Sequence, residues 1–361
     1  MAWSIEEFNC KLNRVRELMY RENIKNLLIE TQTNFLWLSG GRPYVNKATA
    51  NACGSLLVTC DKVYLVANNI EARRLMDEEL KGLPVEMAEY PWWDEAGKNK
   101  TLEELCNGDR IWTDEELSGK IARLRWSLVP QEVERFKETG RCASLILEKV
   151  AMEVEPGQTE LEVAAKVKEV SSSYGLEPWV TLVGADDRAY SYRHPVPTEK
   201  KVEKYVLLAI SGQKWGLYAS ATRLVHFGKP PEDLKRRHEA VLKVDAAMIG
   251  ATVPGAKVKD IFERARKAYK NVGFPEEWKN HHQGGLAGYN SREFRATPDC
   301  DVTVEENQVY AWNPTIAGAK SEDTILIEKG GPVIITPCIN FPTVDVEYEG
   351  FCIKRPDILI R

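Results

Sequence analysis

The sequence lacks the positive charge that a nucleic-acid-binding protein needs. Its 361 residues include 49 lysines and arginines against 54 aspartates and glutamates, which gives a net charge of −5 at pH 7. Without a basic excess to neutralise phosphates, the chain is not expected to bind nucleic acid. Hydrophobic residues make up 43% and charged residues 29%, a composition that is typical of globular proteins and excludes intrinsic disorder.

Paired cysteines and long apolar runs are also missing. The eight cysteines are dispersed, with no CxxC pair and no zinc-ligand spacing, so we expect buried free thiols in a reducing cytoplasm. The N-terminus carries acids where a signal peptide has bases, and the longest apolar run, Tyr205–Ile210, is too short to cross a membrane. The sequence therefore predicts a cytoplasmic protein with no membrane partner. It also contains no P-loop, dinucleotide fingerprint, GxSxG elbow or HExxH motif.

Two regions of different pattern divide the chain. In residues 1–126, helical spacing over 5–22 and 70–81 alternates with short runs that are typical of strands. Two of these runs, 54–60 and 62–67, meet at an Asp-Lys turn and predict a hairpin. A charged amphipathic stretch then opens residues 127–361. We predict an α/β (α+β) protein of two domains with these bounds.

An internal repeat organises the second region. Pro156-Gly157 is followed by 17 residues and then Gly175, and Pro254-Gly255 with Gly273 repeats this pattern 98 residues further on. Each interval is amphipathic, and each closing glycine suits a left-handed helix cap. We infer two related units of helix and strands about a pseudo-twofold axis, with a site between their sheets. Chance recurrence of common Pro-Gly turns is the alternative.

Four segments of the second region resemble the signature blocks of a known family: VTLVGADDRAYSYRHPVP, LLAISGQKWGLYASATRLVHFG, HHQGGLAGYNSRE and NPTIAGAKSEDTILI. In this order they resemble the family of creatinase, prolidase and aminopeptidase P. The resemblance covers nearly the whole chain, because the opening segment FNCKLNRVRELMYRENIKNLLI is similar to that family's N-terminal domain. It implies a creatinase-like domain over residues 1–126, a pseudo-symmetric pita-bread domain over 127–361, and a homodimer.

The resemblance also concerns a metal site. Most members of that family are two-metal peptidases whose ligands are two aspartates, one histidine and two glutamates. Here the aspartate positions fall on Ala209 and Ser220, the histidine on Gly285 and the first glutamate on Asn313, while the second glutamate is Glu322. Because two divalent cations held close together require several anionic ligands, we expect no metal cofactor.

Hydrolysis without a metal needs another way to activate water, and a histidine that titrates near neutrality is the usual substitute. His194 lies in the HPVP segment, where the family keeps a histidine beside the substrate. Creatinase is a metal-free member that uses this histidine, so the resemblance implies that His194 is an acid/base. Glu322 is expected to bind a cationic group of the substrate or to orient His194, and a strand carboxylate paired with a lysine is the alternative. We predict a metal-independent hydrolase acting on a C–N bond of a small cationic or amino-acid-like substrate.

Further residues are candidates for substrate binding. Arg292 could grip a carboxylate, and Glu293 follows it in the same block. Arg223 matches a Thr-Arg pair of the family and is either a substrate contact or part of a structural ion pair. His281 matches the first histidine of its block and is expected in the cleft, whereas His282, the next residue on a strand, is expected to point outward.

Arg42 and Tyr44 are candidates in the first region. They lie in a loop that Gly40-Gly41 and Pro43 fix, and family members often roof the active site with this domain of the neighbouring subunit. The resemblance therefore implies a substrate contact, and a plain surface turn is the alternative.

Two alternatives remain for the function. The fold could persist as a catalytically inactive binding module, as in some relatives. Residual Xaa-Pro aminopeptidase or dipeptidase activity with a single displaced metal is the other. Convergence of His194, Glu322, Arg223 and His281 in one polar cleft would favour catalysis.

Overall fold

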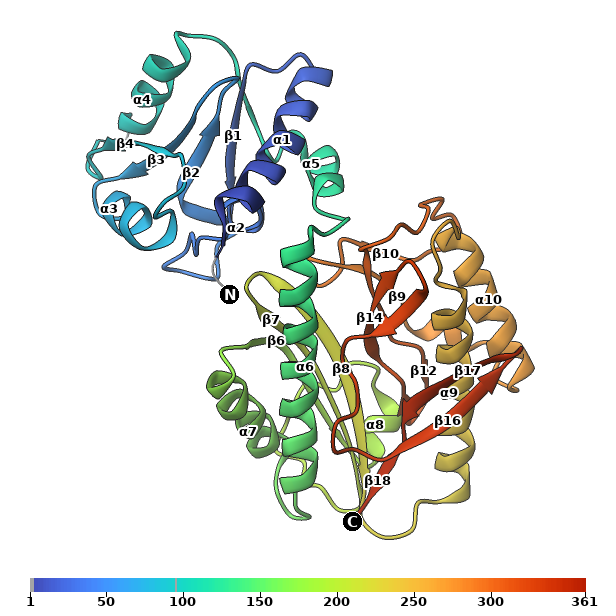
Figure 1. Ribbon diagram of the computed structural model, residues 1–361. Coiled ribbons are helices and arrows are strands. Elements are labelled where there is room, and N and C mark those ends of the chain that lie inside the picture. The colour runs from blue at the N-terminus through green and yellow to red at the C-terminus, as the bar shows by residue number, and fades with distance from the viewer. Residues whose placement is uncertain (1–2, 95) are drawn as a thin grey trace. The chain divides into compact units, whose positions relative to one another are not determined.

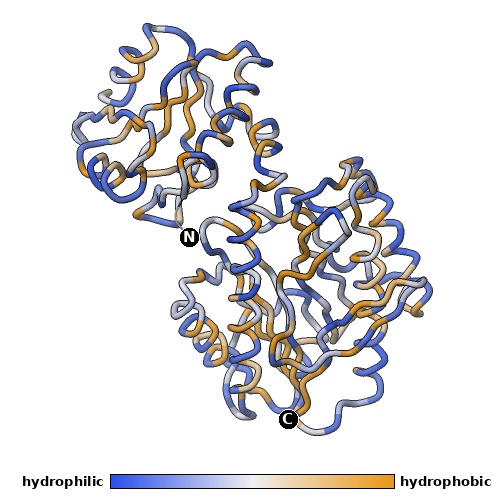
Figure 2. The backbone as a smooth tube through the Cα atoms, viewed as in Figure 1, coloured by the Kyte–Doolittle hydropathy of each residue, from blue (hydrophilic) through white to orange (hydrophobic). Residues whose placement is uncertain are grey.

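The computed structural model describes residues 3–94 and 96–361, and the chain divides into two compact units, Met1–Trp126 and Ser127–Arg361 (Figure 1). Apolar residues concentrate on the strands of both units, while hydrophilic residues predominate on the outer helices and loops (Figure 2). None of the described helices combines the length and the apolar character needed to span a bilayer.

The first unit is built around a five-stranded sheet in the order β4-β3-β2-β1-β5. The predicted hairpin is confirmed, because β2 and β3 pair antiparallel. Helix α1 buries Phe8, Leu12, Val15 and Met19, which share one helical face. The strands are β1 (Asn26–Thr31), β2 (Asn51–Val58), β3 (Val63–Asn68), β4 (Glu86–Tyr90) and β5 (Ile111–Thr113). The helices are α1 (Ile5–Arg21), α2 (Gln32–Ser39), α3 (Ala72–Arg74) continued by the π-helical η1 (Leu75–Glu79), α4 (Gly97–Cys106) and α5 (Ser118–Leu124).

The second unit contains two larger sheets and four long helices. The first sheet has the order β18-β8-β7-β6 and is packed against α6 and α7, and the second has the order β10-β9-β11-β14-β15. The helices are α6 (Pro130–Glu153), α7 (Glu160–Ser173), α8 (Asp187–Ser191), α9 (Glu232–Ala251), α10 (Val258–Asn271) and the 3-10 helix η2 (Glu277–Asn280). The strands of the two sheets are β6 (Glu177–Ala185), β7 (Tyr205–Lys214), β8 (Leu217–His226), β18 (Ile358–Ile360), β9 (Gly284–Ala287), β10 (Phe294–Arg295), β11 (Val309–Trp312), β14 (Asp323–Glu328) and β15 (Gly331–Ile334). Two small hairpins pair β12 (Thr315–Ile316) with β13 (Ala319–Lys320) and β16 (Thr343–Tyr348) with β17 (Phe351–Pro356).

The internal repeat is confirmed in the helices of the second unit. Helices α7 and α10 have 14 residues each, and both bounds of α10 lie 98 residues after those of α7. Gly157 and Gly255 precede them with φ of +92° and +89°, and Gly175 and Gly273 follow them with φ of +63° and +85°. Glycine adopts this left-handed backbone without steric cost, so the same two turns bound both helices.

The cysteines are free, as expected, but not all are buried. Cys106 and Cys142 are buried, whereas Cys10, Cys60 and Cys352 are exposed. The expectation of burial is wrong for these three, because they occupy the outer face of α1, the turn after β2 and the exposed hairpin of β16 and β17.

Candidate functional site

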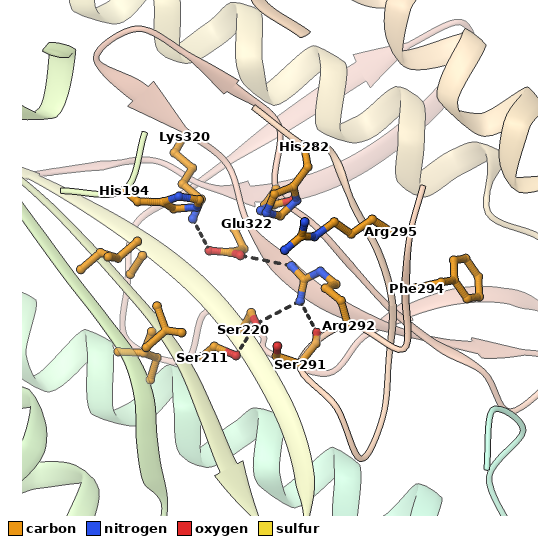
Figure 3. A pocket seen from close by; sticks show the side chains of 15 residues that line it. His194, Ser211, Ser220, His282, Ser291, Arg292, Phe294, Arg295, Lys320 and Glu322 are labelled. Atoms are coloured by element: carbon orange, nitrogen blue, oxygen red, sulfur yellow. Dashed lines mark hydrogen bonds and ion pairs between the residues drawn. The ribbon is translucent and has the colours of Figure 1, made fainter. Parts of the chain in front are cut away.

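A cavity of about 420 Å³ lies within the second unit, where strands of its two sheets meet (Figure 3). Its size suits a small molecule. The first half of the unit contributes Val180, Leu182, His194, Ala209, Ile210, Ser211 and Ser220, and the second half contributes His282, Ser291, Arg292, Phe294, Arg295, Asn313, Lys320 and Glu322. The cavity thus draws its lining from both halves of the unit, where the repeat predicts a site.

Hydrogen bonds between strands β8 and β14 fix the floor of the cavity. The amide of Ser220 donates to Thr324 Oγ1 (2.8 Å), and this hydroxyl donates in turn to the carbonyl of Ser220 (2.9 Å). Two residues along β8, the amide of Thr222 donates to the carbonyl of Glu322 (3.0 Å). On the neighbouring strand Ser211 pairs with Ser220, and their hydroxyls lie 3.0 Å apart. Side chains from the two sheets are therefore held at fixed positions around one space.

Glu322 is the centre of a buried charge cluster. Its Oε2 accepts hydrogen bonds from Lys320 Nζ (2.7 Å) and Thr222 Oγ1 (2.8 Å), and its Oε1 lies 3.5 Å from Nη2 of Arg292. Burial alone would raise the pKa of Glu322, but the charges of Lys320 and Arg292 outweigh burial and lower it. Glu322 is thus ionised at neutral pH, and its carboxylate is already paired with cations of the protein.

Three histidines gather beside this cluster. His194 and His281 place their Nε2 atoms 3.0 Å apart, and the His282 ring centroid lies 4.5 Å from that of His281. Burial, followed by the charges of Lys320 and Arg295, lowers the pKa of His194 below its usual value. Burial likewise lowers the pKa of His281 far below its usual range, and burial with the charges of Arg292 and Arg295 lowers that of His282 to about 4. All three imidazoles are therefore neutral at pH 7.

Two arginines occupy the side of the cavity opposite His194. Arg292 is largely buried; its Nη1 donates to the carbonyl of Ser291 (2.6 Å) and lies 3.5 Å from Ser220 Oγ. Its Nε has no hydrogen-bond partner among the described residues. The Arg295 guanidinium points toward Arg292 and His282 (Figure 3).

The structure brings only some of the predicted site residues to the cavity. His194, Glu322 and Arg292 line it, and His281 lies behind His194 with 8% of its surface exposed. The expectation that His282 points outward is wrong: it lines the cavity, because the residues around it are not in a regular strand and successive side chains do not alternate there. Sequence reasoning thus found the acid/base candidate but not its full surroundings.

Other predicted site residues have structural contacts instead. Arg223 is fully buried, and its guanidinium pairs with Asp323 (3.1 Å) and donates to the carbonyl of Thr336 (3.1 Å), so it forms the structural ion pair and not the substrate contact. Glu293 accepts hydrogen bonds from the amides of Tyr289 (3.1 Å) and Asn290 (3.3 Å), which closes their loop and keeps its carboxylate out of the cavity lining.

Arg42 and Tyr44 belong to the first unit and do not line this cavity. Arg42 pairs with Glu79 at 2.8 Å, and Lys47 Nζ lies 5.5 Å from the Tyr44 ring centroid. Their contact with a substrate stays a prediction.

The positions that the resemblance assigned to metal ligands meet in the cavity. Ala209, Ser220, Asn313 and Glu322 all line it. Gly285 has no room for a side chain, because a Cβ there would lie 2.1 Å from the carbonyl oxygen of Phe294. Alanine and glycine offer no donor, and the carboxylate of Glu322 is already paired. These residues do not fit a pair of divalent cations.

The three histidines are a separate candidate for a single ion. One ring nitrogen from each of His194, His281 and His282 lies within 4.8 Å of the others. Neutral imidazoles are good ligands for transition metals. Burial, and after it the charges of Lys320 and Arg295, lowers the pKa of His194, and the positive field of these two cations opposes a divalent cation.

Lys320 and Arg295 are cavity residues that sequence reasoning missed. Lys320 precedes Glu322 by two residues, a spacing that places both side chains on one face of an extended segment, so the sequence did contain a signal for this pair. Arg295 follows Arg292 by three residues across a loop and a two-residue strand, and no sequence period relates them.

Comparison with known proteins identifies the family of the chain. The model of metallopeptidase family M24 matches residues 134–329. A curated Xaa-Pro dipeptidase of Pyrococcus horikoshii is 27% identical over 350 residues, covering 91% of this chain and 97% of the relative. Among solved structures, a prolidase of Pyrococcus horikoshii aligns with a TM-score of 0.74 at 22% identity, covering 91% of this chain and 98% of its own. A dipeptidase of the same organism aligns with a TM-score of 0.78 at 20% identity, covering 97% and 100% of the two chains, and both share the pita-bread fold with this chain.

Proposed function

The chain belongs to metallopeptidase family M24, and from this premise we propose that it hydrolyses a C–N bond of a small amino-acid-like substrate without a two-metal site. The observation that carries the proposal is the position of His194, which lines one small cavity together with a buried Lys320–Glu322 pair and Arg292. A base, a fixed positive charge and a carboxylate-binding group are what metal-free hydrolysis requires.

His194 is the acid/base in this proposal. Its hydrogen bond to His281 fixes the ring, and when His194 donates its Nε2 proton to His281, its Nδ1 carries the lone pair. This Nδ1 takes a proton from water as the water oxygen bonds to the carbonyl or amidine carbon. It then returns that proton to the leaving nitrogen as the C–N bond breaks, which releases an amine and the hydrolysed fragment. His281 acts as a positioning residue.

The cations of the cavity complete the mechanism. Lys320 is held at 2.7 Å from Glu322, and its fixed charge would stabilise the oxyanion that develops as water adds. The Nε of Arg292 has no hydrogen-bond partner in the described parts of the chain, and Arg292 lines the cavity, so it would bind the substrate carboxylate and orient the bond that is cleaved. Glu322 is already paired with Lys320 and Arg292. Its role in this mechanism is therefore to position these two cations, and it does not bind a cation of the substrate.

An activity screen tests the proposal. The full chain, treated with a chelator, would be incubated with N-acyl, N-carbamoyl and N-amidino amino acids, and amine release would be measured. We expect turnover of at least one class in the chelator, loss of that turnover in His194→Ala, and retention in Arg141→Gln, which changes an exposed side chain. Turnover that His194→Ala leaves unchanged would contradict the proposal, and binding without any turnover would favour an inactive binding module.

The similarity to a Xaa-Pro dipeptidase over 91% of the chain favours a second candidate, hydrolysis of a Xaa-Pro dipeptide. The C-terminal carboxylate of such a dipeptide would also suit Arg292. Alanyl-proline with and without Mn²⁺ separates the two candidates, because turnover that appears only with the metal would replace the metal-free proposal.

A further inference from the structure

The cavity holds more positive charge than its single carboxylate balances. Lys320, Arg292 and Arg295 line it together with Glu322, and the histidines beside them are neutral. Lys320 takes the short contact with Glu322 at 2.7 Å, while Arg292 reaches the same carboxylate only at 3.5 Å. The side chains that line the cavity therefore carry a surplus of positive charge.

Arg295 is the unbalanced group. No carboxylate of the described residues forms an ion pair with it, although surface arginines elsewhere in the unit have acidic partners, such as Arg236 with Asp233 at 3.0 Å. Its guanidinium points instead toward Arg292 and His282 (Figure 3). Like charges held close together are unfavourable unless an anion lies between them. The arrangement is therefore that of an anion-binding subsite beside the one assigned to Arg292.

We propose that the substrate carries a second carboxylate, which Arg295 binds, so that the substrate class is N-acylated or N-amidino derivatives of dicarboxylic amino acids. The inference rests on the proposed function in taking this cavity as the substrate site. Two separate guanidinium groups match two separate single charges, and a guanidinium binds a planar carboxylate through two parallel hydrogen bonds. The aliphatic carbons between the carboxylates would contact the apolar part of the lining, which includes Leu182 and Ile210.

Calorimetric titration of the full chain tests the inference without turnover. The probes are N-acetyl-L-glutamate and its near-isosteric amide N-acetyl-L-glutamine, followed by N-acetyl-L-aspartate and N-acetyl-L-asparagine. We expect at least one dicarboxylate to bind about tenfold to a hundredfold more tightly than its amide, the range for one charge-assisted hydrogen-bonded contact. Inorganic phosphate is a compact dianion without the aliphatic carbons that would contact Leu182 and Ile210, so it should bind more weakly than that dicarboxylate.

Variants assign the preference to Arg295. Arg295→Gln should bind the dicarboxylate and its amide equally, Arg295→Lys should keep part of the difference, and Arg141→Gln should keep all of it. Arg295 is exposed, so thermal melting should show that Arg295→Gln folds as the parent does.

Equal binding of both members of each pair, no binding of any probe, tighter binding of phosphate, or a preference that survives Arg295→Gln would each overturn the inference. A preference without hydrolysis would contradict the proposed function alone, and hydrolysis of monocarboxylates with no preference would contradict the second carboxylate alone.

Discussion

Removal of the Glu322 carboxylate should destabilise the second unit because it leaves a buried ammonium without its counter-charge. Lys320 and Glu322 have 4% and 6% of their side chains exposed, and their charged atoms lie 2.7 Å apart. Breaking a buried pair by removing one partner costs about 3–5 kcal/mol. The amide oxygen of Glu322→Gln can still accept from Lys320, so we expect the lower end, about 3 kcal/mol. For a unit of this size that is a fall in Tm of about 6–12 °C.

A second substitution tests this explanation through the direction in which it changes the stability of Glu322→Gln. Lys320→Met removes the stranded ammonium, so the double variant Glu322→Gln/Lys320→Met should be more stable than Glu322→Gln alone by more than about 1 kcal/mol. The double variant should remain less stable than the parent protein, because Arg292 also loses its carboxylate neighbour. The assay is urea unfolding of the four proteins of the cycle, followed by tryptophan fluorescence and circular dichroism.

The control is a surface ion pair between helix α6 and the end of strand β14. Glu328 lies 3.0 Å from Lys137 with both side chains about 40% exposed, so Glu328→Gln should cost less than about 1 kcal/mol. A double variant no more stable than Glu322→Gln, or equal costs for Glu322→Gln and Glu328→Gln, would refute the account of the buried pair.

Three further predictions concern the histidines. His194→Ala should lower kcat by about 10²- to 10⁴-fold, which is the usual contribution of a general base. His281→Asn should lower kcat less and leave KM similar. Equal losses of kcat in the two variants would contradict their separate roles. Because the pKa of His194 is lowered, its base form persists below pH 6.5, so kcat/KM should fall only at more acidic pH; a midpoint at or above 6.5 would argue against His194. His282 has its folded pKa lowered to about 4, so the unfolded chain binds that proton more readily and stability should fall as pH drops from about 6.5 to 4. In urea unfolding, His282→Asn should reduce this loss of stability at acidic pH. An unchanged pH dependence of stability in His282→Asn would contradict the assignment to His282.

The fold could be predicted from the sequence to a large extent because its signals are local and repeated. Pro-Gly turns and closing glycines with the same spacing bound α7 and α10, and the structure places both helices 98 residues apart. The resemblance supplied what local signals could not, namely that Ala209, Ser220, Asn313 and Glu322 would meet. These residues come from two segments more than 90 residues apart in the sequence, and tertiary pairing of β8 with the start of β14 joins them.

The charge balance of the site could not be predicted in the same way. His282 was assigned outward by strand alternation, but its backbone is irregular and turns the ring inward. Arg223 matched a family position, yet its guanidinium satisfies Asp323 in the core. Whether Glu322 is free or paired depends on the distances to Lys320 and Arg292, which sequence spacing does not determine.

The central claim is that this cavity works without a pair of bound metals, and metal content tests it most directly. The purified full chain would be incubated with Mn²⁺, Co²⁺ or Zn²⁺, desalted and analysed by elemental mass spectrometry. The account predicts fewer than about 0.2 metal ions per chain, because one paired carboxylate cannot retain two divalent cations and the positive field beside the three histidines opposes a single one. A stoichiometry near one or two ions per chain would contradict it.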